Sequence, residues 1–369
     1  MVISSEGFAE AGPQGAQYQE EVRSILKTTG IRGFGPNTLG LVNTATGLTT
    51  SYYANSRMLQ PGPLGIVAQS GIFVGALLRY LSSLEGLQIS KGIGLGNKVD
   101  VDESEALEYL LEDEQTRMIG VYLEDVRNGR RFLETAKKAA ARKPVLVLKG
   151  GRTVEGAQAA ASHTASLAIT HNLFDAALRQ AGVLYMPTIS DFISCLKGFV
   201  HAPLPRGPRI ALVTYSGAQA IMSIDSAVEK GLKLARFSKA TIQKISQVIA
   251  TASKSKNPVD LFPDMQAHGF AKTTQDILKA LLADDGVDGI IFITFADPEI
   301  NPLQSILEIA PRGFTKPLFF SLLGGNKDFM EGQALLEKNG IPCFDFPETA
   351  IMVFANMWKY ARTFIELHK

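Results

Sequence analysis

Apolar and polar residues alternate along most of the chain in a way that predicts short strands separated by amphipathic helices. Between residues 63 and 201, five apolar runs have the length and composition of buried parallel strands, at 64–68, 92–95, 118–123, 145–148 and 183–185. Segments with helical periodicity separate these runs, at 72–84, 103–112, 129–141 and 169–180. This alternation is typical of βαβ units, so it predicts an α/β fold with a parallel sheet.

The same plan begins again after the proline-rich connection 201–208, whose prolines cannot continue the preceding helix. Strand-like runs follow at 209–213, 289–295, 317–322 and 343–346, with helices at 218–229 and 348–365 among those between and after them. In both halves the first strand leads into a serine-glycine turn and a helix, at Ser70-Gly71 and Ser216-Gly217. The sequence therefore predicts two doubly wound parallel-sheet domains, residues 63–203 and 207–369, related by duplication.

The first 62 residues contain a predicted helix at 18–29 and a short strand with a glycine-proline turn within 30–43. One strand and one helix cannot bury a core of their own. Two interpretations stay open: the segment packs on the next domain, or it completes a domain whose first half is absent.

Composition and charge exclude several classes of function. At 369 residues, 46% hydrophobic and 20% charged, the chain is long enough for two or three globular domains. A net charge of +1 gives no electrostatic case for nucleic acid or an anionic membrane surface. Cys195 and Cys343 have no metal-ligand spacing, so we expect buried, reduced thiols and no metal site. Without a signal peptide or a membrane-spanning run, a cytoplasmic location is expected.

A cationic, glycine-rich turn follows the predicted strand 145–148, and small residues follow the turn. The turn contains Lys149 and Arg152, at the kind of strand end where open α/β sheets bind ligands. The small residues then bring Ser162-His163-Thr164 into a segment with little bulk around it. An accessible histidine can be catalytic, whereas lone histidines are often structural, and both interpretations of His163 stay open here.

The serine-glycine turns are the other candidates for chemistry. At the start of a helix, unsatisfied backbone N–H groups and partial positive charge form an anion site. The alternative is that Ser70 and Ser216 only cap their helices. Two such turns in matched positions, together with the histidine segment, favour phosphate binding.

Several segments of this chain resemble one known family, above all the SHT segment. The chain is similar to the NDP-forming acyl-CoA synthetases, the group that contains succinyl-CoA synthetase and ADP-forming acetyl-CoA synthetase. The segments that carry the resemblance are GFAEAGPQG, GFGPNTLGLVN, GIVAQSG, GIGLGNKVDVDESEALEYLLED, VYLEDV, KGGRTVEGAQAAASHTASLA, TYSGAQAIMSID, NPVDL and LLGGNKD, followed by GIPCFDFPETA. The resemblance implies two flavodoxin-like domains and the reversible conversion of acyl-CoA, phosphate and ADP into acid, CoA and ATP.

The resemblance also implies roles for particular residues. His163 would carry the phosphoryl group, Glu124 would orient its imidazole, and the turns Ser70-Gly71 and Ser216-Gly217 would cradle the phosphate. Asp125 competes with Glu124, because both follow the same predicted strand.

Two further pairs of residues are candidates for binding substrates. Lys149 and Arg152 could draw in phosphate, although a solvated basic turn is an equal alternative. Asn97 and Asp100 follow the second strand of their domain and are candidates for lining an acyl or CoA pocket.

The chain also departs from the family pattern. Only the closing strand, helix and GPN turn of a Rossmann-type CoA-binding domain are expected in residues 1–62, and no ATP-grasp module is expected. Ala165 and Ile169 stand where the family usually has glycine. Coenzyme A is therefore expected as a substrate, and ATP or ADP with Mg²⁺ on a partner ATP-grasp subunit in a homo- or hetero-oligomer. The alternatives are a non-catalytic scaffold that binds CoA or a partner, and an acyl-phosphate or carbamoyl-type transferase relative without nucleotide.

Overall fold

The computed structural model describes residues 1–51, 59–164, 171–249, 256–262, 269–297, 303–309 and 313–367, with the backbone alone at 161–164, 171 and 366–367. The chain divides into two compact units, Met1–Leu196 and Lys197–Glu366, which are called the first and second unit below. No helix in the described ranges is both long and apolar enough to cross a membrane.

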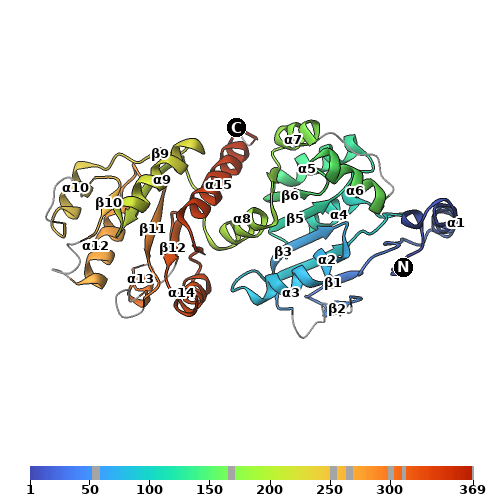
Figure 1. Ribbon diagram of the computed structural model, residues 1–369, viewed down its shortest axis with the longest axis horizontal. Helices are drawn as coiled ribbons and strands as arrows, with labels where there is room; N and C mark the ends of the chain where they lie inside the picture. The colour runs from blue at the N-terminus through green and yellow to red at the C-terminus, as the bar shows by residue number, and fades with distance from the viewer. Residues whose placement is uncertain are drawn as a thin grey trace. The chain divides into compact units, whose positions relative to one another are not determined.

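The first unit is built on a parallel sheet with an antiparallel extension (Figure 1). The parallel strands are β3 (Pro61–Ala68), β4 (Ile89–Gly94), β5 (Met118–Leu123), β6 (Val145–Lys149) and β7 (Leu184–Met186). They lie side by side as β4-β3-β5-β6-β7, which in chain order is 2-1-3-4-5, the order of flavodoxin-like folds. β1 (Leu41–Asn43) pairs antiparallel with β4, and β2 (Leu48–Thr49) pairs with β1.

Helices cover both faces of this sheet because side chains of successive strand residues point to opposite sides. The helices are α2 (Gly71–Val74), α3 (Ala76–Ser83), α4 (Glu103–Glu112), α5 (Gly129–Ala140), α6 (Val154–Thr164), α7 (His171–Gln180) and α8 (Ile189–His201). One face packs on α4, α5 and α7 through a core that includes Val121 and Phe132. On the other face, Gly120 leaves room for Phe192 of α8, since a Cβ there would lie 2.8 Å from that ring.

One predicted helix, residues 72–84, is interrupted. α2 ends after Val74, and α3 begins at Ala76, because Gly75 has the non-helical angles φ −103° and ψ −94°. Glycine has the backbone freedom for such a break and is unfavourable in helix interiors.

The second unit repeats the strand order of the first. Its strands are β8 (Arg209–Thr214), β9 (Lys233–Leu234), β10 (Val259–Asp260), β11 (Gly289–Phe295), β12 (Leu318–Leu323) and β13 (Cys343–Phe344). All pairs are parallel and lie as β10-β8-β11-β12-β13, with β9 also on β8. Its helices are α9 (Gly217–Glu229), α10 (Lys239–Ile245), α12 (Phe270–Leu282), α13 (Gln304–Leu307), α14 (Asn326–Lys338) and α15 (Pro347–Leu367).

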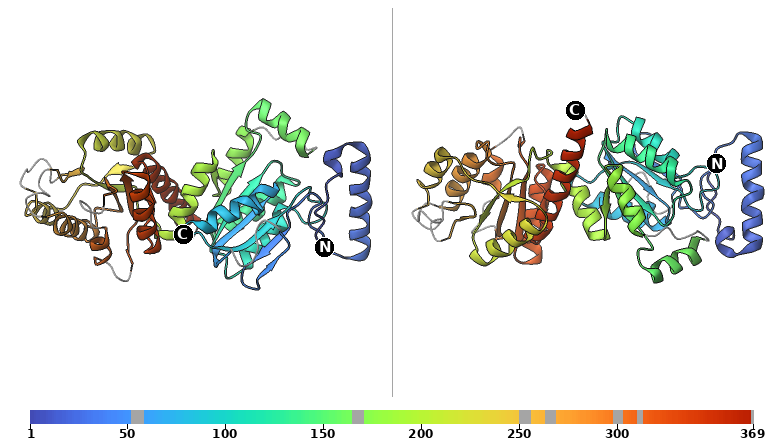
Figure 2. Two further views of the ribbon diagram at one scale, coloured as in Figure 1. Left: turned by 60° about the horizontal axis from the view of Figure 1, so that its bottom comes forward. Right: turned by 90° about the horizontal axis from the view of Figure 1, so that it is seen from above.

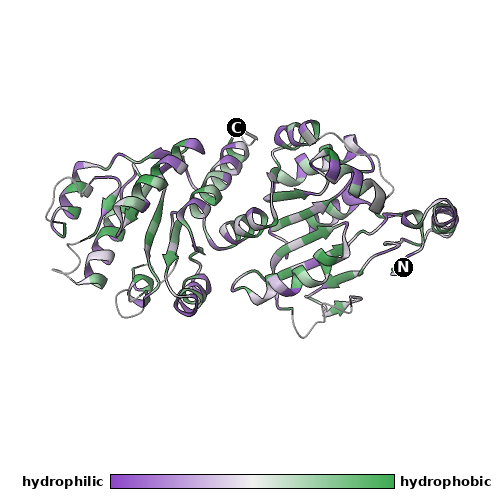
Figure 3. Ribbon diagram, viewed as in Figure 1, coloured by the Kyte–Doolittle hydropathy of each residue, from purple (hydrophilic) through white to green (hydrophobic). Residues whose placement is uncertain are grey.

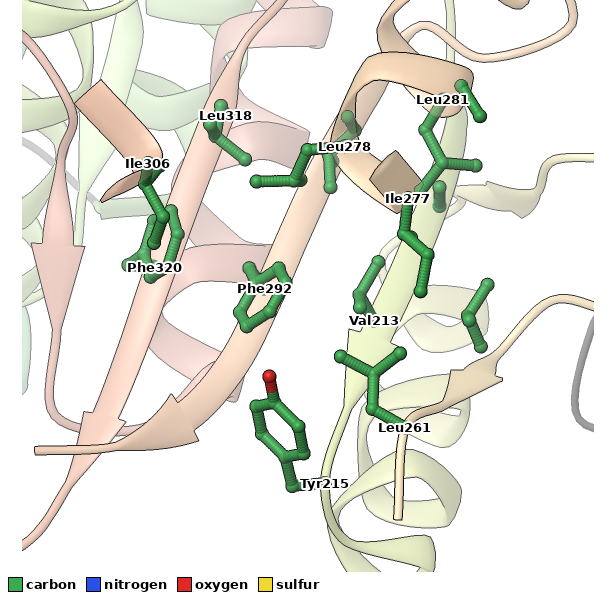
Figure 4. Packing of buried hydrophobic residues seen from close by; sticks show 14 of the residues in the cluster. Val213, Tyr215, Leu261, Ile277, Leu278, Leu281, Phe292, Ile306, Leu318 and Phe320 are labelled. Atoms are coloured by element: carbon green, nitrogen blue, oxygen red, sulfur yellow. The ribbon is translucent and has the colours of Figure 1, made fainter. Parts of the chain in front are cut away.

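The apolar core of the second unit lies between the sheet and α12 (Figure 4). Phe292 of β11 and Phe320 of β12 stack with ring centroids 5.0 Å apart, and Ile277 and Leu278 of α12 cover them. The strands of both units are mostly apolar, whereas the outer helices are mixed (Figure 3). The prediction of two α/β domains with mainly parallel, flavodoxin-like sheets is therefore confirmed.

The N-terminal segment packs on the first unit. Its elements are η1 (Ala9–Ala11) and α1 (Pro13–Thr29), and α1 stands at one end of the unit (Figure 2). Arg32 binds Asp100 at 2.9 Å, and the same carboxylate accepts a bond from the Gly33 N–H. Packing on the next domain is thus observed, and the assignment of residues 1–62 as the remnant of a CoA-binding domain and a linker stays a prediction. The domain limits 63–203 and 207–369 stay a prediction, while Cys195 and Cys343 are buried thiols that form no disulfide in the described part of the chain, as expected.

Candidate functional site

A polar pocket lies at the carboxyl ends of β3, β4 and β5 in the first unit. Its cavity of about 320 Å³ is lined by residues 69–72 after β3, 96 and 97 after β4, 124 after β5, and 4, 6 and 37–39 of the N-terminal segment. In sheets of order 2-1-3-4-5, ligands bind at the carboxyl ends of the first and third strands, where the connections leave in opposite directions. β3 and β5 are these strands, so the pocket occupies the topological switch point.

Four residues singled out from the sequence line this pocket: Ser70, Gly71, Asn97 and Glu124. They come from three separate connections, which only the order of the parallel strands brings together. Their roles in binding and catalysis stay predictions.

Glu124 and its neighbour Asp125 have different surroundings. The Tyr122 hydroxyl donates to Glu124 Oε1 at 3.1 Å, and burial, together with the Glu124 charge, raises the pKa of Tyr122, which keeps it a neutral donor. Asp125 Oδ1 lies 2.5 Å from the Lys98 ammonium and accepts a second bond from Gln69. Only Glu124 of this pair lines the pocket.

Lys149, the last residue of β6, contacts the loop that follows β5. Its ammonium donates to the carbonyl oxygens of Gly150 at 2.9 Å and Glu124 at 3.3 Å, and the side chain is 3% exposed. Burial lowers the pKa of Lys149, although the Asp125 and Glu124 charges oppose that shift. Lys149 is therefore buried and does not belong to a solvated basic turn. Its predicted part in drawing in phosphate stays a prediction.

Arg152 is exposed, its positive charge opposes the rise that burial causes in the pKa of Tyr185, and it does not line the pocket. Its predicted part in drawing in phosphate is untested by this arrangement and stays a prediction.

Asn97 and Asp100 both fasten the N-terminal segment. The Asn97 amide donates to Glu10 Oε2 and to Gln19 Oε1, at 2.5 and 2.9 Å. Burial opposes ionisation of Glu10, but hydrogen bonds from Asn97 and from backbone N–H groups outweigh it and lower the Glu10 pKa. Asp100 binds Arg32 and does not line the pocket. A role of either residue in acyl or CoA binding stays a prediction.

A glycine lets the N-terminal segment form one side of the pocket. Gly96 has φ +56°, and a Cβ on it would lie 2.1 Å from the Pro36 carbonyl oxygen. The adjacent Asn97 N–H donates to that oxygen at 2.9 Å. Any side chain at residue 96 would therefore push residues 37–39 away from the end of β4.

The two serine-glycine turns differ in their capping. Ser70 precedes the four-residue α2 without a capping bond from its side chain. Ser216 caps the 13-residue α9, because its Oγ accepts from the Gln219 N–H at 3.4 Å. The capping alternative thus describes Ser216 and not Ser70, and the two turns lie in different units. Their joint cradle for phosphate stays a prediction.

His163 belongs to α6, whose backbone is described through Thr164. Its side chain lies outside the described residues, as do Ala165 and Ile169. The assignment of His163 as phosphoryl carrier therefore stays a prediction.

Sequence reasoning missed Gln69 and residues 37–39 as parts of the pocket. Gln69 directly precedes Ser70, but its bonds to the loop after β5 depend on strand pairing. Asn37 is the last residue of the GPN turn, and Thr38 and Leu39 follow it in the segment GFGPNTLGLVN, which carries part of the family resemblance.

Comparisons with known proteins place the chain in a family. A profile for a succinyl-CoA ligase-like flavodoxin domain matches residues 61–199. The alpha subunit of acetate–CoA ligase (ADP-forming) II from Pyrococcus furiosus is 34% identical over 94% of this chain and 75% of its own length. This chain belongs to the ADP-forming acyl-CoA synthetase family. Acetate–CoA ligase (ADP-forming) II from Archaeoglobus fulgidus is 38% identical over 99% of this chain but 54% of that protein.

A solved member of the family shares the fold. The dinucleotide-forming acetyl-coenzyme A synthetase 1 of Ca. Korarchaeum cryptofilum, in complex with phosphate and ADP, matches with a TM-score of 0.90 at 27% identity. That match covers 100% of this chain and 79% of the solved chain. The chain thus spans about half the length of the relative from A. fulgidus and most of the alpha subunit from P. furiosus.

Proposed function

We propose that this chain is the phosphoryl-carrying part of an ADP-forming acyl-CoA synthetase. The reaction is acid, CoA and ATP to acyl-CoA, ADP and phosphate, and it is reversible. The observation that carries the proposal is the pocket at the switch point of the first unit, which is lined by both the carboxylate residue Glu124 and the turn Ser70-Gly71.

The chemistry runs in three balanced steps. Phosphate oxygen attacks the acyl-CoA carbonyl, which forms acyl phosphate and releases CoA thiol. A ring nitrogen of His163 then attacks the phosphorus, which breaks the P–O bond and releases the acid. Finally the phosphoryl group passes from His163 to ADP, which gives ATP and the free imidazole. In-line transfer of this kind depends on positioning and on stabilising the charge.

The residues of this chain have distinct tasks in these steps. A nucleophilic imidazole needs a neutral attacking nitrogen, while its other nitrogen keeps a proton that an acceptor holds. Glu124 is proposed as this acceptor, because Asp125 is already engaged with Lys98 and Gln69. Backbone N–H groups at Gly71 and Ile72 would bind phosphate oxygens. α2 is too short for a large macrodipole, so these donors would act mainly as hydrogen bonds.

The binding sites for CoA and for the nucleotide would lie partly on other modules. The chain would work in an oligomer with an ATP-grasp subunit that holds ATP or ADP and Mg²⁺, in the cytoplasm. The printed names support this division, since two relatives from P. furiosus are named as alpha subunits. Exposed apolar side chains, Ile25 and Ile31, near the end of the first unit would contribute to the contact surface.

The test of the proposal is phosphorylation of the purified chain. We expect incubation with ³²P-labelled acetyl phosphate to give an acid-labile, base-stable label, and His163→Asn to abolish it without changing the circular dichroism spectrum. Label that persists in His163→Asn would show that another residue carries the phosphoryl group. A chain that takes no label even with an ATP-grasp subunit and ATP present would favour the scaffold alternative.

A further inference from the structure

Gln69 is a buried amide at the switch point of the first unit. It directly follows β3 and is 5% exposed. Its backbone N–H donates to the Tyr122 carbonyl oxygen at 3.0 Å, which extends the pairing of β3 with β5 by one bond. The side chain therefore projects from a fixed backbone position next to the connection that carries Glu124.

The Gln69 side chain uses both ends of its amide on that connection. Its Oε1 accepts from the backbone N–H groups of Glu124 at 2.9 Å and Asp125 at 3.1 Å. Its Nε2 donates to Asp125 Oδ1 at 2.5 Å. One side chain thus fixes two consecutive peptide groups and one of the two neighbouring carboxylates.

The same oxygen of the Asp125 carboxylate also contacts a buried positive charge. Lys98 is 4% exposed, and its ammonium contacts Asp125 Oδ1 at 2.5 Å and Glu103 Oε2 at 3.1 Å. With its backbone N–H and carboxylate both fixed, Asp125 cannot rotate into the pocket without leaving Lys98 and Gln69. Breaking buried charged contacts of this kind is costly.

We propose that Gln69 is a positioning residue that selects Glu124, rather than Asp125, as the carboxylate that faces the pocket. Only the consequence for phosphoryl transfer rests on the proposed function, because it requires His163 to be the partner of Glu124. The contact of Gln69 with the loop after β5 does not depend on the reaction, so it can be measured without turnover.

Glutamine has properties for this task that its near-isosteric replacements lack. Leucine fills a similar volume but leaves two backbone N–H groups without their acceptor, and each unsatisfied group costs about 1–3 kcal/mol. Glutamate still accepts both N–H bonds, but it cannot donate to Asp125 and it adds a like charge beside that residue. Gln69→Leu and Gln69→Glu therefore separate the two halves of the interaction.

The first experiment measures how firmly Gln69 holds this loop, by hydrogen exchange of the peptide that contains Glu124 and Asp125, whose backbone N–H groups donate to Gln69 Oε1. We expect faster exchange there in Gln69→Leu and protection close to wild type in Gln69→Glu. Gln333→Leu is the matched control, because the Gln333 amide also donates to a carboxylate, that of Glu337, but lies in the second unit. Unchanged exchange of this peptide in a folded Gln69→Leu chain would overturn the proposal.

The second experiment measures the consequence for phosphoryl transfer. Labelling by acetyl phosphate should fall about 10–100-fold in Gln69→Leu, the usual effect of losing a partner that orients a functional group. Gln69→Glu should restore part of this loss, and Gln333→Leu should label like wild type. In a Glu124→Gln background, Gln69→Leu should have little further effect, since residues that act as a unit are non-additive.

The outcomes separate this inference from the proposed function. Full additivity with Glu124→Gln, or wild-type labelling in Gln69→Leu, would show that Gln69 does not act through Glu124. A wild-type chain that takes no label would defeat the proposed function, whereas the hydrogen-exchange result would still decide whether Gln69 positions the connection.

Discussion

The switch points of the two units have the same strand order but different side chains. In the first unit Ala68 pairs with Tyr122, and in the second unit Thr214 pairs with Ile293. The residue that follows the paired residue of the first strand is Gln69 in the first unit and Tyr215 in the second. The second residue after the paired residue of the third strand is Glu124 in the first unit and Phe295 in the second. An amide and a carboxylate in the first unit thus correspond to two aromatic rings in the second.

Because of these side chains, the switch point of the second unit is apolar, whereas that of the first unit is polar. Tyr215 is 5% exposed and stacks on Phe270 and Phe295, with centroids 5.2 and 6.3 Å away, and it meets Phe292 edge-on. Figure 4 shows Tyr215 directly below Phe292 in the core. The Tyr215 hydroxyl shares a bond with Thr274, and burial raises its pKa. The first switch point is a polar cavity, whereas the second is largely packed, so a shared fold does not imply shared chemistry.

The largest expected effect comes from removing an aromatic ring from the packed switch point of the second unit. Tyr215→Ala should lower the free energy of unfolding of the second unit by about 3–5 kcal/mol, because a large aromatic side chain is removed from a core. Urea denaturation followed by circular dichroism measures it, with Tyr215→Phe as the control that keeps the ring. A loss below about 1 kcal/mol in Tyr215→Ala would show that this switch point is not a packed core.

The next effect distinguishes two adjacent carboxylates in the first unit. Glu124→Gln should reduce phosphoryl labelling of the chain at least about 100-fold, the scale of general acid–base catalysis, with little change in stability. Asp125→Asn should instead destabilise the unit by about 1.5–3 kcal/mol, because the buried Lys98 ammonium keeps only Glu103 as a carboxylate partner. Labelling by acetyl phosphate and urea denaturation, applied to both variants, measure the two effects. If Asp125→Asn abolishes labelling while Glu124→Gln does not, the two roles are reversed.

The smallest effect concerns the N-terminal side of the polar pocket. The pKa of Glu10 is below its usual 4.5 in the folded chain, so its stabilising contribution is present above that value and is lost as the pH falls through the folded pKa. We therefore expect residues 7–12 to loosen below about pH 4.5, which is the ordinary range for a glutamate. Pepsin cleavage near Phe8, measured at each pH relative to an unstructured peptide of the same sequence because the activity of pepsin itself changes with pH, should accelerate over that interval, and Glu10→Gln should remove most of this relative pH dependence. A relative cleavage rate in the native chain that does not change with pH would contradict this expectation.

Much of the fold was predictable because local signals and tertiary packing agree. The helix predicted at 103–112 has these bounds, since Asp102 caps it through the N–H groups of Ser104 and Glu105. The strands predicted at 118–123 and 289–295 also match, because each is a short, continuous apolar run. The strand predicted at 343–346 ends at Phe344, because only Cys343 and Phe344 find partners on β12.

The candidate site was predictable only in part. Its serine-glycine turn and its carboxylates follow strands, so the sequence places them at one edge of the sheet. The distinction between Glu124 and Asp125 requires contacts with Gln69 and Lys98, which lie 56 and 27 residues from Asp125 along the chain. No local pattern records such contacts.

The edges of the two sheets bear on how this protein behaves at high concentration. In the described ranges, the outermost strands are β2 and β7 in the first unit and β9, β10 and β13 in the second, each of two or three residues. A long free edge offers unpaired backbone groups to the strand of another molecule, and very short border strands reduce that risk. β4, whose six residues are all buried, would be such an edge if β1 did not lie against it. The short antiparallel hairpin of the N-terminal segment therefore also protects the sheet against edge-to-edge aggregation.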